Sequence, residues 1–296
     1  MADYAVQAII CMVLNDLIAE QDCYIVGEED ATELRTDKQA SIRKAVVEAV
    51  RAWRPQATED DVLNAIDMCN HDGMSNGFWA LDPIDGTKGF LRGKHYAIAL
   101  GRIEGGTVVA GVMGCPNLSA SQSYPLDQND PDGVVYAASK NAGAWEFPKC
   151  DPRLTPMKIL ASHFLADKPL RFCESAEKKH SNQSDSSRII NAIGNEGEPA
   201  RLDSQCKYAL VARGQADGYL RLPTNKAYVE KIWDHAAGMC IAQEAGALVT
   251  DINGKSLDFS HGARLEKNRG VICAIDGLQQ KILNTINTLE IGKEEA

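Results

Sequence analysis

Two carboxylates and a hydroxyl stand close together in one short segment, at Asp82, Asp85 and Thr87. Carboxylate oxygens suit Mg²⁺, which commonly binds one or two of them together with water and a substrate phosphate. Two carboxylates on one small loop also repel each other unless a cation lies between them. This spacing therefore favours metal-assisted hydrolysis of a phosphate ester.

The residues before Thr87 predict how the carboxylates come together. An apolar run at residues 78–81 predicts a strand that ends at Asp82. Pro83 fixes its own φ and favours an extended Asp82, so we expect the chain to turn and bring Asp85 to the same side. A plain surface turn is the alternative, because Asp-Pro and Asp-Gly pairs are both ordinary turn signals.

The wider segment, residues 79–90, is more specific than a turn signal. Gly86 allows the backbone to approach a ligand closely, and Thr87 offers a hydroxyl and an N–H at a position where a helix can begin. The segment resembles the signature of the lithium-sensitive, magnesium-dependent phosphomonoesterases, the superfamily that includes inositol monophosphatase, fructose-1,6-bisphosphatase and 3'(2'),5'-bisphosphate nucleotidase. Its ending, residues 88–90, is most similar to the nucleotidase branch, and the resemblance extends over residues 3–274.

The resemblance implies metal ligands in two more segments. Glu28 follows a short apolar strand, where an acidic residue taken alone indicates a solvated loop; the superfamily carries Gly-Glu-Glu at this point, with its first Glu a ligand. Asp234 taken alone indicates a helix N-cap, which is compatible with facing a cation. The neighbouring His235 is expected to be structural or to support a metal ligand, because Mg²⁺ prefers oxygen. The implied ligands of two or three Mg²⁺ ions are Glu28, Asp82, Asp85, Asp234 and the carbonyl of Ile84, and inhibition by Li⁺ is implied with them.

Catalytic and substrate-binding residues follow from the same resemblance. The attacking water needs a proton acceptor, and the implied one is Asp3, in an Asp-Tyr-Ala segment, paired with Thr87. Residues 203–208 and 219–223 resemble the segments that hold the nucleoside phosphate, with surface charges on unrelated faces as the alternative. A hydroxyl, an ammonium and a planar guanidinium there suit phosphate binding. The implied substrate-binding residues are Gly86, Thr87, His180, Ser204, Lys207 and Arg221.

Composition limits the compartment and the partners. The 296 residues are 44% hydrophobic and 24% charged, as in an ordinary globular protein. Nine cysteines without a C-x-x-C pair predict reduced thiols in the cytoplasm rather than a disulfide framework or a zinc cluster. The sequence shows neither a signal peptide nor a membrane-spanning apolar run. The net charge of −10 predicts no binding to nucleic acid polymers or membranes, so a polyanionic small molecule needs metal ions or local Lys and Arg residues at its site.

The alternation of helical and strand-like segments predicts an α+β fold, and the resemblance implies a layered αβαβα sandwich. We expect an N-terminal domain, residues 1–154, with most metal ligands, and a C-terminal domain, residues 155–296, with the substrate segment and the last ligand. A proline-rich linker at residues 148–156 joins them. Helices are predicted at 5–18, 36–51, 58–69, 185–195, 205–213, 234–245 and 278–289, and strands at 23–26, 97–103, 108–113, 134–138, 157–162, 170–173, 247–250 and 270–274.

The sequence thus predicts a phosphomonoesterase that hydrolyses 3'-phosphoadenosine 5'-phosphate to AMP and phosphate with metal-activated water. Two alternatives stay open. One is an inositol polyphosphate 1-phosphatase, an activity that some relatives share. The other is a non-catalytic nucleotide sensor, which the loss of a metal carboxylate or of Thr87 would have favoured; all of these residues are present.

Overall fold

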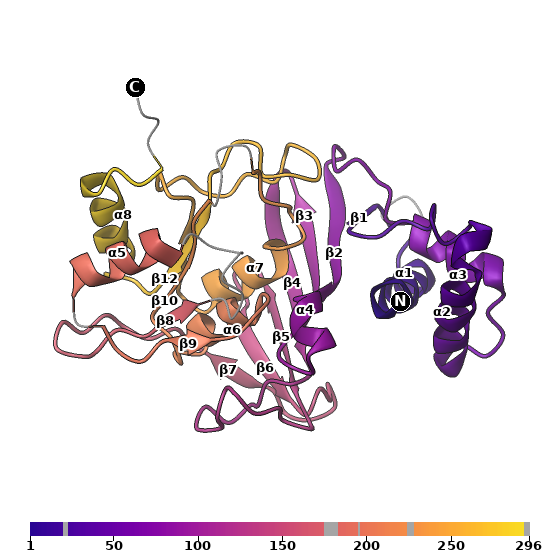
Figure 1. Cartoon of the computed structure of the whole chain (residues 1–296), viewed down its shortest axis with the longest axis horizontal. Helices are drawn as coiled ribbons and strands as arrows, with labels where there is room; N and C mark the ends of the chain where they lie inside the picture. The colour runs from indigo at the N-terminus through magenta and orange to yellow at the C-terminus, as the bar shows by residue number, and fades with distance from the viewer. Residues whose placement is uncertain (20–22, 175–182, 195, 224–227, 293–296) are drawn as a thin grey trace.

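The structure, a computed structural model, describes residues 1–19, 23–174, 183–194, 196–223 and 228–292. Layers of helices and strands alternate through it, from the N-terminal helices through a seven-stranded sheet, a central helical layer and a five-stranded sheet to a last helical layer (Figure 1). This arrangement confirms the predicted layered α+β sandwich. The helices are α1 (Ala2–Leu17), a 3₁₀ turn (Asp37–Gln39), α2 (Ala40–Trp53), α3 (Glu59–Asp67), α4 (Thr87–Leu91), α5 (Gln183–Ile193), α6 (Cys206–Ala212), α7 (Ala236–Glu244) and α8 (Gln279–Thr288).

The large sheet contains its strands in chain order, from β1 to β7. β1 and β2 run parallel, and each later pair runs antiparallel, as expected for strands that are joined without a crossover helix. β7 follows residue 155, so the second predicted domain adds an edge strand to the sheet of the first. The strands are β1 (Ile25–Gly27), β2 (Gly77–Asp85), β3 (Ala97–Glu104), β4 (Thr107–Cys115), β5 (Val134–Ser139), β6 (Gly143–Pro148) and β7 (Met157–Ile159).

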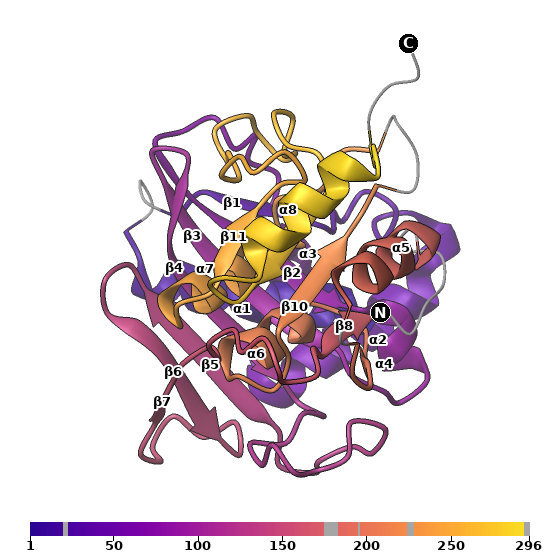
Figure 2. The same cartoon turned by 90° about the vertical axis from the view of Figure 1, so that its left-hand side faces the viewer.

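The small sheet has the order β11-β12-β10-β8-β9 and mixes parallel with antiparallel pairs. Helices α5 and α8 lie side by side over it (Figure 2). One apolar core extends from the large sheet through α6 and α7 into the small sheet, so residues of both predicted domains share it. The strands are β8 (Phe172–Glu174), β9 (Ala200–Arg201), β10 (Gly218–Arg221), β11 (Leu248–Thr250) and β12 (Val271–Ala274).

Helix α7 covers one face of the large sheet. Buried and half-buried residues alternate along β3, as the period of two along a strand requires. Gly101 of β3 lies directly under the helix, since a Cβ there would be 2.7 Å from the Cβ of Ala236. Only glycine permits this close approach of helix and sheet.

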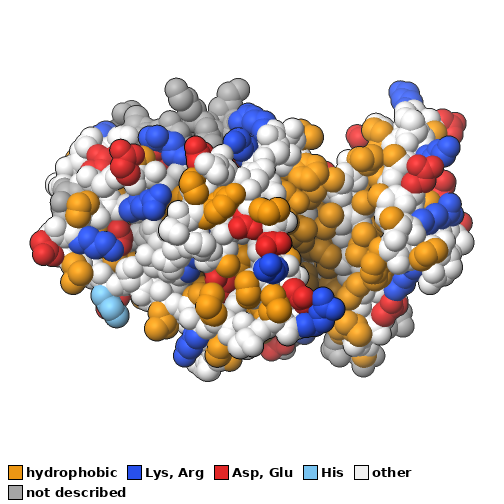
Figure 3. All heavy atoms as spheres, turned by 90° about the horizontal axis from the view of Figure 1, so that it is seen from below, with side chains coloured by type: hydrophobic (Ala, Val, Ile, Leu, Met, Phe, Trp, Pro, Cys, Tyr) orange, Lys and Arg blue, Asp and Glu red, His pale blue; other side chains and the backbone are white. Residues whose placement is uncertain are grey.

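The opposite face of the large sheet, which we call the open face, is only partly covered. Helix α1 contacts β2, whereas the side chains that point away from α7 along β3 to β6 are half-buried or exposed. Figure 3 shows hydrophobic side chains gathered along the hollow between the N-terminal helices and the rest of the molecule. Strand register places the apolar side chains of the open face in rows; they are Ile98, Leu100, Val112, Val135, Ala137, Trp145 and Phe147.

The N-terminal helices α1, α2 and α3 pack around a second apolar core, which includes Ile25 of β1 and Leu81 of β2. Helix α3 begins at a capping box: the Thr58 hydroxyl accepts from the N–H of Asp61, and the Asp61 carboxylate accepts from the N–H of Thr58. Among the described residues, no helix is both long and apolar enough to cross a membrane.

Most predicted elements are present within a few residues of their expected bounds, but the strands β6, β9 and β10 were not predicted, and one helix begins later than expected. Strand β6 occupies residues 143–148, where we predicted no strand; its alternating burial extends the sheet up to Pro148. Helix α7 begins at Ala236 and not at Asp234, because residues 233–235 form a turn before the helix.

Candidate functional site

A β-bulge brings the two carboxylates of the motif together. The prediction that the strand ends at Asp82 was wrong, because β2 continues to Asp85. Residues three positions apart on a regular strand point to opposite faces. Here Asp82 pairs with Ala99 and Asp85 with Ala97, so two residues of β2 lie opposite one residue of β3 and the alternation shifts by one position. The bulge therefore places both carboxylates on one side.

The chain leaves the bulge through Gly86, whose φ of 87° is left-handed. A Cβ at Gly86 would lie 3.0 Å from the Cβ of Ser204, so glycine also permits the approach of the second half of the chain. Helix α4 begins at Thr87, and the Thr87 hydroxyl donates to the carbonyl of Ile84 at 3.2 Å. The hydroxyl and the carbonyl that the sequence singled out thus contact each other.

Parallel pairing of β1 with β2 places Glu28 near Asp82. Gly27 pairs with Leu81, so Glu28 and Asp82, which come next on the two parallel chains, lie beside each other at the end of β1. Glu28 is exposed and points into the cavity described below. The two segments lie more than fifty residues apart in the sequence, as their numbers show, and the register alone joins them.

Helix α1 carries Asp3, and its Gln7 side chain holds the loop after β1 by hydrogen bonds. The side-chain amide of Gln7 donates to the carbonyl of Glu29 at 2.6 Å, and its oxygen accepts from the N–H of Glu29 at 3.2 Å. Asp3 lies one turn earlier on the helix and adds its negative charge to the surroundings of Glu28 and Glu29. It lies 3.8 Å from the amino terminus. The Thr87 hydroxyl bonds within its own loop, and the implied pairing of Asp3 with Thr87 stays a prediction.

Asp234 reaches the same region from the second half of the chain. Its predicted N-cap role was wrong, since His235 is the N-cap residue of α7 and its side chain makes no capping hydrogen bond. The Asp234 carboxylate instead accepts a hydrogen bond from Nη2 of Arg221 at 2.9 Å. The imidazole of His235 is fully buried beneath the turn.

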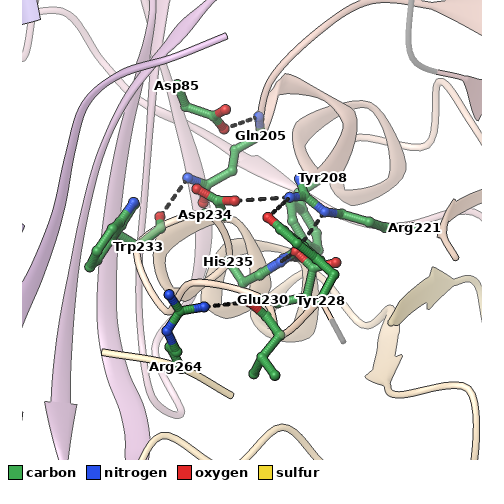
Figure 4. Close-up of polar contacts among 11 residues, drawn as sticks. Asp85, Gln205, Tyr208, Arg221, Tyr228, Glu230, Trp233, Asp234, His235 and Arg264 are labelled. Carbon is green, nitrogen blue, oxygen red and sulfur yellow. Dashed lines mark hydrogen bonds and ion pairs between the residues drawn. The ribbon is translucent and has the colours of Figure 1, made fainter. Parts of the chain in front are cut away.

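Gln205 ties the two carboxylate segments together (Figure 4). Its backbone N–H donates to Oδ2 of Asp85 at 2.6 Å. Its side-chain amide donates to the carbonyl of Trp233 at 2.9 Å and accepts from the N–H of Gly238 at 3.0 Å. One buried residue therefore sets the position of Asp85 relative to the turn that carries Asp234.

These segments enclose a cavity of about 280 Å³. Lys207 is almost completely buried, and its ammonium lies 5.2 Å from the centre of the Tyr219 ring. Of the predicted site residues, Asp3 does not line the cavity, and His180 lies outside the described residues. The predicted residues that do line it are Glu28, Asp82, Ile84, Asp85, Gly86, Thr87, Ser204, Lys207, Arg221 and Asp234.

Four of the carboxylates that line this cavity, those of Glu28, Asp82, Asp85 and Asp234, repel one another. Burial, followed by the charges of Asp85 and Asp234, raises the pKa of Asp82 well above its ordinary value. Burial and the charge of Asp234 raise the pKa of Asp85 to about 6 and that of Glu28 to about 7. Oδ1 of Asp82 is buried without a hydrogen-bond partner. A cation would satisfy this oxygen, and the oxygen-only donor set fits a hard divalent ion.

Glu230 and His235 also bring ligand atoms within 4.8 Å of an oxygen of Asp234. Neither lines the cavity, and they contact each other at 3.2 Å. The cation position is therefore better assigned to the cavity carboxylates. Sequence reasoning overlooked Glu230, Gln205 and Tyr208, although Glu230 stands only four residues before Asp234.

The raised pKa values predict that the metal-free protein loses stability as the pH rises. Folding raises the pKa of these carboxyl groups. Below about pH 4 such a group is protonated in both the folded and the unfolded state and does not destabilise the fold, whereas its full destabilising effect applies above the folded-state pKa, near pH 7. Water screens the exposed Glu28, which reduces the effect. We therefore expect Tm to fall by about 2–6 °C between pH 5 and pH 7.5, which corresponds to a loss of about 1–2 kcal/mol in the free energy of unfolding. Calorimetry in a chelating buffer measures this change, and a Tm that rises over the same range contradicts the assignment.

The model of the inositol monophosphatase family matches residues 1–290. The chain belongs to the inositol monophosphatase family. A relative from Schizosaccharomyces pombe, a 3'(2'),5'-bisphosphate nucleotidase, is 40% identical over 292 residues, which cover 95% of this chain and 81% of the relative. The 3'(2'),5'-bisphosphate nucleotidase 1 of Arabidopsis thaliana is 39% identical over 310 residues, covering 100% of this chain and 87% of that protein.

Solved structures of the inositol monophosphatase family have the same fold. An inositol monophosphatase family protein of Staphylococcus aureus matches with a TM-score of 0.60 at 15% identity, covering 100% of this chain and 84% of that one. The Thermotoga maritima IMPase matches with a TM-score of 0.53 at 17% identity, covering 97% and 94%. The family consists of metal-dependent phosphatases that act on small-molecule phosphates, so this acidic cavity is the candidate active site of such an enzyme.

Proposed function

We propose that this enzyme is a Mg²⁺-dependent 3'(2'),5'-bisphosphate nucleotidase that hydrolyses 3'-phosphoadenosine 5'-phosphate to AMP and phosphate. One observation carries the proposal: a single cavity combines a cluster of carboxylates with cationic side chains, among them Lys207 and Arg221. The carboxylates suit the phosphate that reacts, and the cations suit a second phosphate that stays on the product. The names of the curated relatives support the same substrate class.

The residues of the cavity divide the reaction between them. Bound Mg²⁺ would supply an activated water and stabilise the leaving oxygen. The Thr87 hydroxyl would orient the attacking water, and Asp3, whose charge adjoins Glu28, is the proposed proton acceptor. The proposed ligands of two or three ions are Glu28, Asp82, Asp85, Asp234 and the Ile84 carbonyl, and the proposed substrate contacts are Gly86, Thr87, His180, Ser204, Lys207 and Arg221.

Two further properties belong to the proposal. Li⁺ should inhibit the enzyme, as the resemblance to the lithium-sensitive phosphomonoesterases implies. The cytoplasm is the proposed location, since all nine cysteines are free thiols, the state that a reducing compartment maintains.

Phosphate release from three substrates tests the proposed function. With Mg²⁺ present, kcat/KM should be highest for 3'-phosphoadenosine 5'-phosphate and lower for adenosine 3'-monophosphate and inositol 1,4-bisphosphate. A preference for the inositol bisphosphate would instead identify an inositol polyphosphate 1-phosphatase. Binding of the nucleotide without hydrolysis of any substrate would identify a sensor.

Replacing Thr87 with Ala should lower kcat about tenfold and change KM little. The hydroxyl is exposed at the cavity and contacts Ile84, so it orients groups during the reaction and adds little to substrate binding. Steady-state kinetics measures the two constants. Thr87→Ser keeps the hydroxyl and should restore most of kcat, whereas a rise in KM with an unchanged kcat would show that the hydroxyl acts in substrate binding and not in the reaction.

A further inference from the structure

A chain of polar contacts leads from the protein interior to Asp234 (Figure 4). The buried imidazole of His235 contacts the Tyr208 hydroxyl through Nδ1 at 2.8 Å and the Glu230 carboxylate through Nε2 at 3.2 Å. Oε2 of Glu230 also lies 2.8 Å from Nε of Arg221. Nη2 of Arg221 donates to Asp234 at 2.9 Å. Arg221 thus bridges two carboxylates, and only one of them faces the cavity.

The inner part of this chain lies behind the cavity wall. Arg221 and Asp234 line the cavity, whereas Glu230, His235 and Tyr208 do not. Glu230 is 5% exposed. Burial alone would raise its pKa, but the hydrogen bond from His235 and the charge of Arg221 together lower that pKa to about 2. Glu230 is therefore an ionised carboxylate held at a fixed position.

The position of Arg221 creates a conflict at Asp234. A guanidinium that pairs with a metal ligand competes with the metal for the same negative charge. A buried guanidinium without a carboxylate partner is costly, so Arg221 must pair with an anion. Glu230 supplies that anion from the side away from the cavity, which leaves the Asp234 carboxylate less firmly bound to Arg221.

We propose that Glu230 is a positioning residue for the metal site: it anchors Arg221 so that Asp234 remains available to a divalent cation. His235 and Tyr208 orient Glu230 in turn. This inference rests on the proposed function only in taking Mg²⁺ as the cation. It assigns a task to three buried side chains that do not line the cavity but contact one another in a chain. Tyr208 lies on α6, whereas Glu230 and His235 precede α7, so the fold brings them together.

A double-mutant cycle tests the proposal without any substrate. Calorimetric titration gives the Kd of Mg²⁺ for the wild type, Glu230→Gln, Arg221→Met and the double variant. Glu230→Gln should weaken Mg²⁺ binding about tenfold, in the range for groups that orient metal ligands, because Arg221 then pairs with Asp234 alone. Arg221→Met should bind Mg²⁺ at least as tightly as the wild type. The two changes should not add, because Glu230 has no guanidinium to hold in the double variant.

Matched variants separate this role from a merely structural one. Glu104→Gln removes a carboxylate that also pairs with an arginine, Arg102 at 3.2 Å, on a strand end outside the cavity; its Kd for Mg²⁺ should equal that of the wild type. Glu230→Asp keeps the charge but shortens the side chain, and should weaken binding less than Glu230→Gln. If Glu230→Gln does not fold, Glu230→Asp replaces it in the cycle.

Three results would overturn the proposal. Unchanged Mg²⁺ affinity in Glu230→Gln would remove its basis. An equal loss in the presence and absence of Arg221 would show that Glu230 acts on the fold and not through Arg221. A wild-type protein that binds no Mg²⁺ would refute this inference and the proposed cofactor together. Binding of Mg²⁺ without hydrolysis of any bisphosphate would refute only the proposed function, and the cycle would still decide the role of Glu230.

Discussion

Replacing Asp85 with Asn should lower kcat for 3'-phosphoadenosine 5'-phosphate by at least about a hundredfold in the presence of Mg²⁺. The substitution removes one charge from the cavity and keeps the size of the side chain. Asn can still accept the hydrogen bond that Gln205 donates at 2.6 Å, so the loop should keep its shape. The loss corresponds to about 2.7 kcal/mol of transition-state stabilisation, a modest share of what a metal centre supplies.

The same variant should be more stable than the wild type when no metal is present. Burial and Asp234 raise the pKa of Asp85 to about 6, so its charge costs free energy in the folded state near pH 7.5. Removing that charge should raise Tm in a chelating buffer while activity falls. Asp60→Asn, an exposed change on α3, provides the control and should alter kcat little. Near wild-type kcat in Asp85→Asn would refute the metal-site assignment.

Arg221→Ala should reduce kcat/KM for 3'-phosphoadenosine 5'-phosphate roughly 10- to 150-fold. This loss corresponds to about 1.5–3 kcal/mol of transition-state stabilisation, the range for a hydrogen bond to a charged group. Arg221 lines the cavity on β10, and its planar guanidinium suits a phosphate that is not cleaved. Adenosine 3'-monophosphate lacks that phosphate. It should be hydrolysed slowly by both proteins, with little difference between them.

Comparing the two substrates separates two roles of Arg221. Its contact with Asp234 at 2.9 Å means that its removal also changes the surroundings of a proposed metal ligand. That second effect should be equal for both substrates, whereas a lost phosphate contact affects the bisphosphate alone. Equal losses would show that Arg221 supports the metal site, and the substrate assignment would lose its main physical support.

The local part of the site was predictable from the sequence because neighbouring residues determine it. Asp82, Asp85 and Thr87 fall within six positions of one another, so any compact conformation of that segment brings them together. The sequence did not distinguish a turn from a β-bulge, since Pro83 is compatible with both. That choice depends on the pairing with β3, which lies outside the segment.

The remote part of the site depends on register and packing. Glu28 was identified through the family resemblance. Its place beside Asp82 follows from the parallel pairing of β1 with β2, which no local sequence pattern predicts. Gln205 contacts Asp85, which lies 120 residues earlier in the sequence. Glu230 contacts Arg221, which lies 9 residues earlier. Their residue types suit many surface positions equally well, so only the folded chain shows what they contact.

The open face of the large sheet affects how the folded protein behaves in concentrated solution. Val112 is 43% exposed there, in the same row as Leu100 and Ala137. Because these side chains are in contact with water after folding, the native state itself has an exposed apolar surface that can associate with other molecules. Salts such as ammonium sulfate strengthen apolar association, so the salting-out point of this enzyme reflects the folded molecule as well as any unfolded fraction.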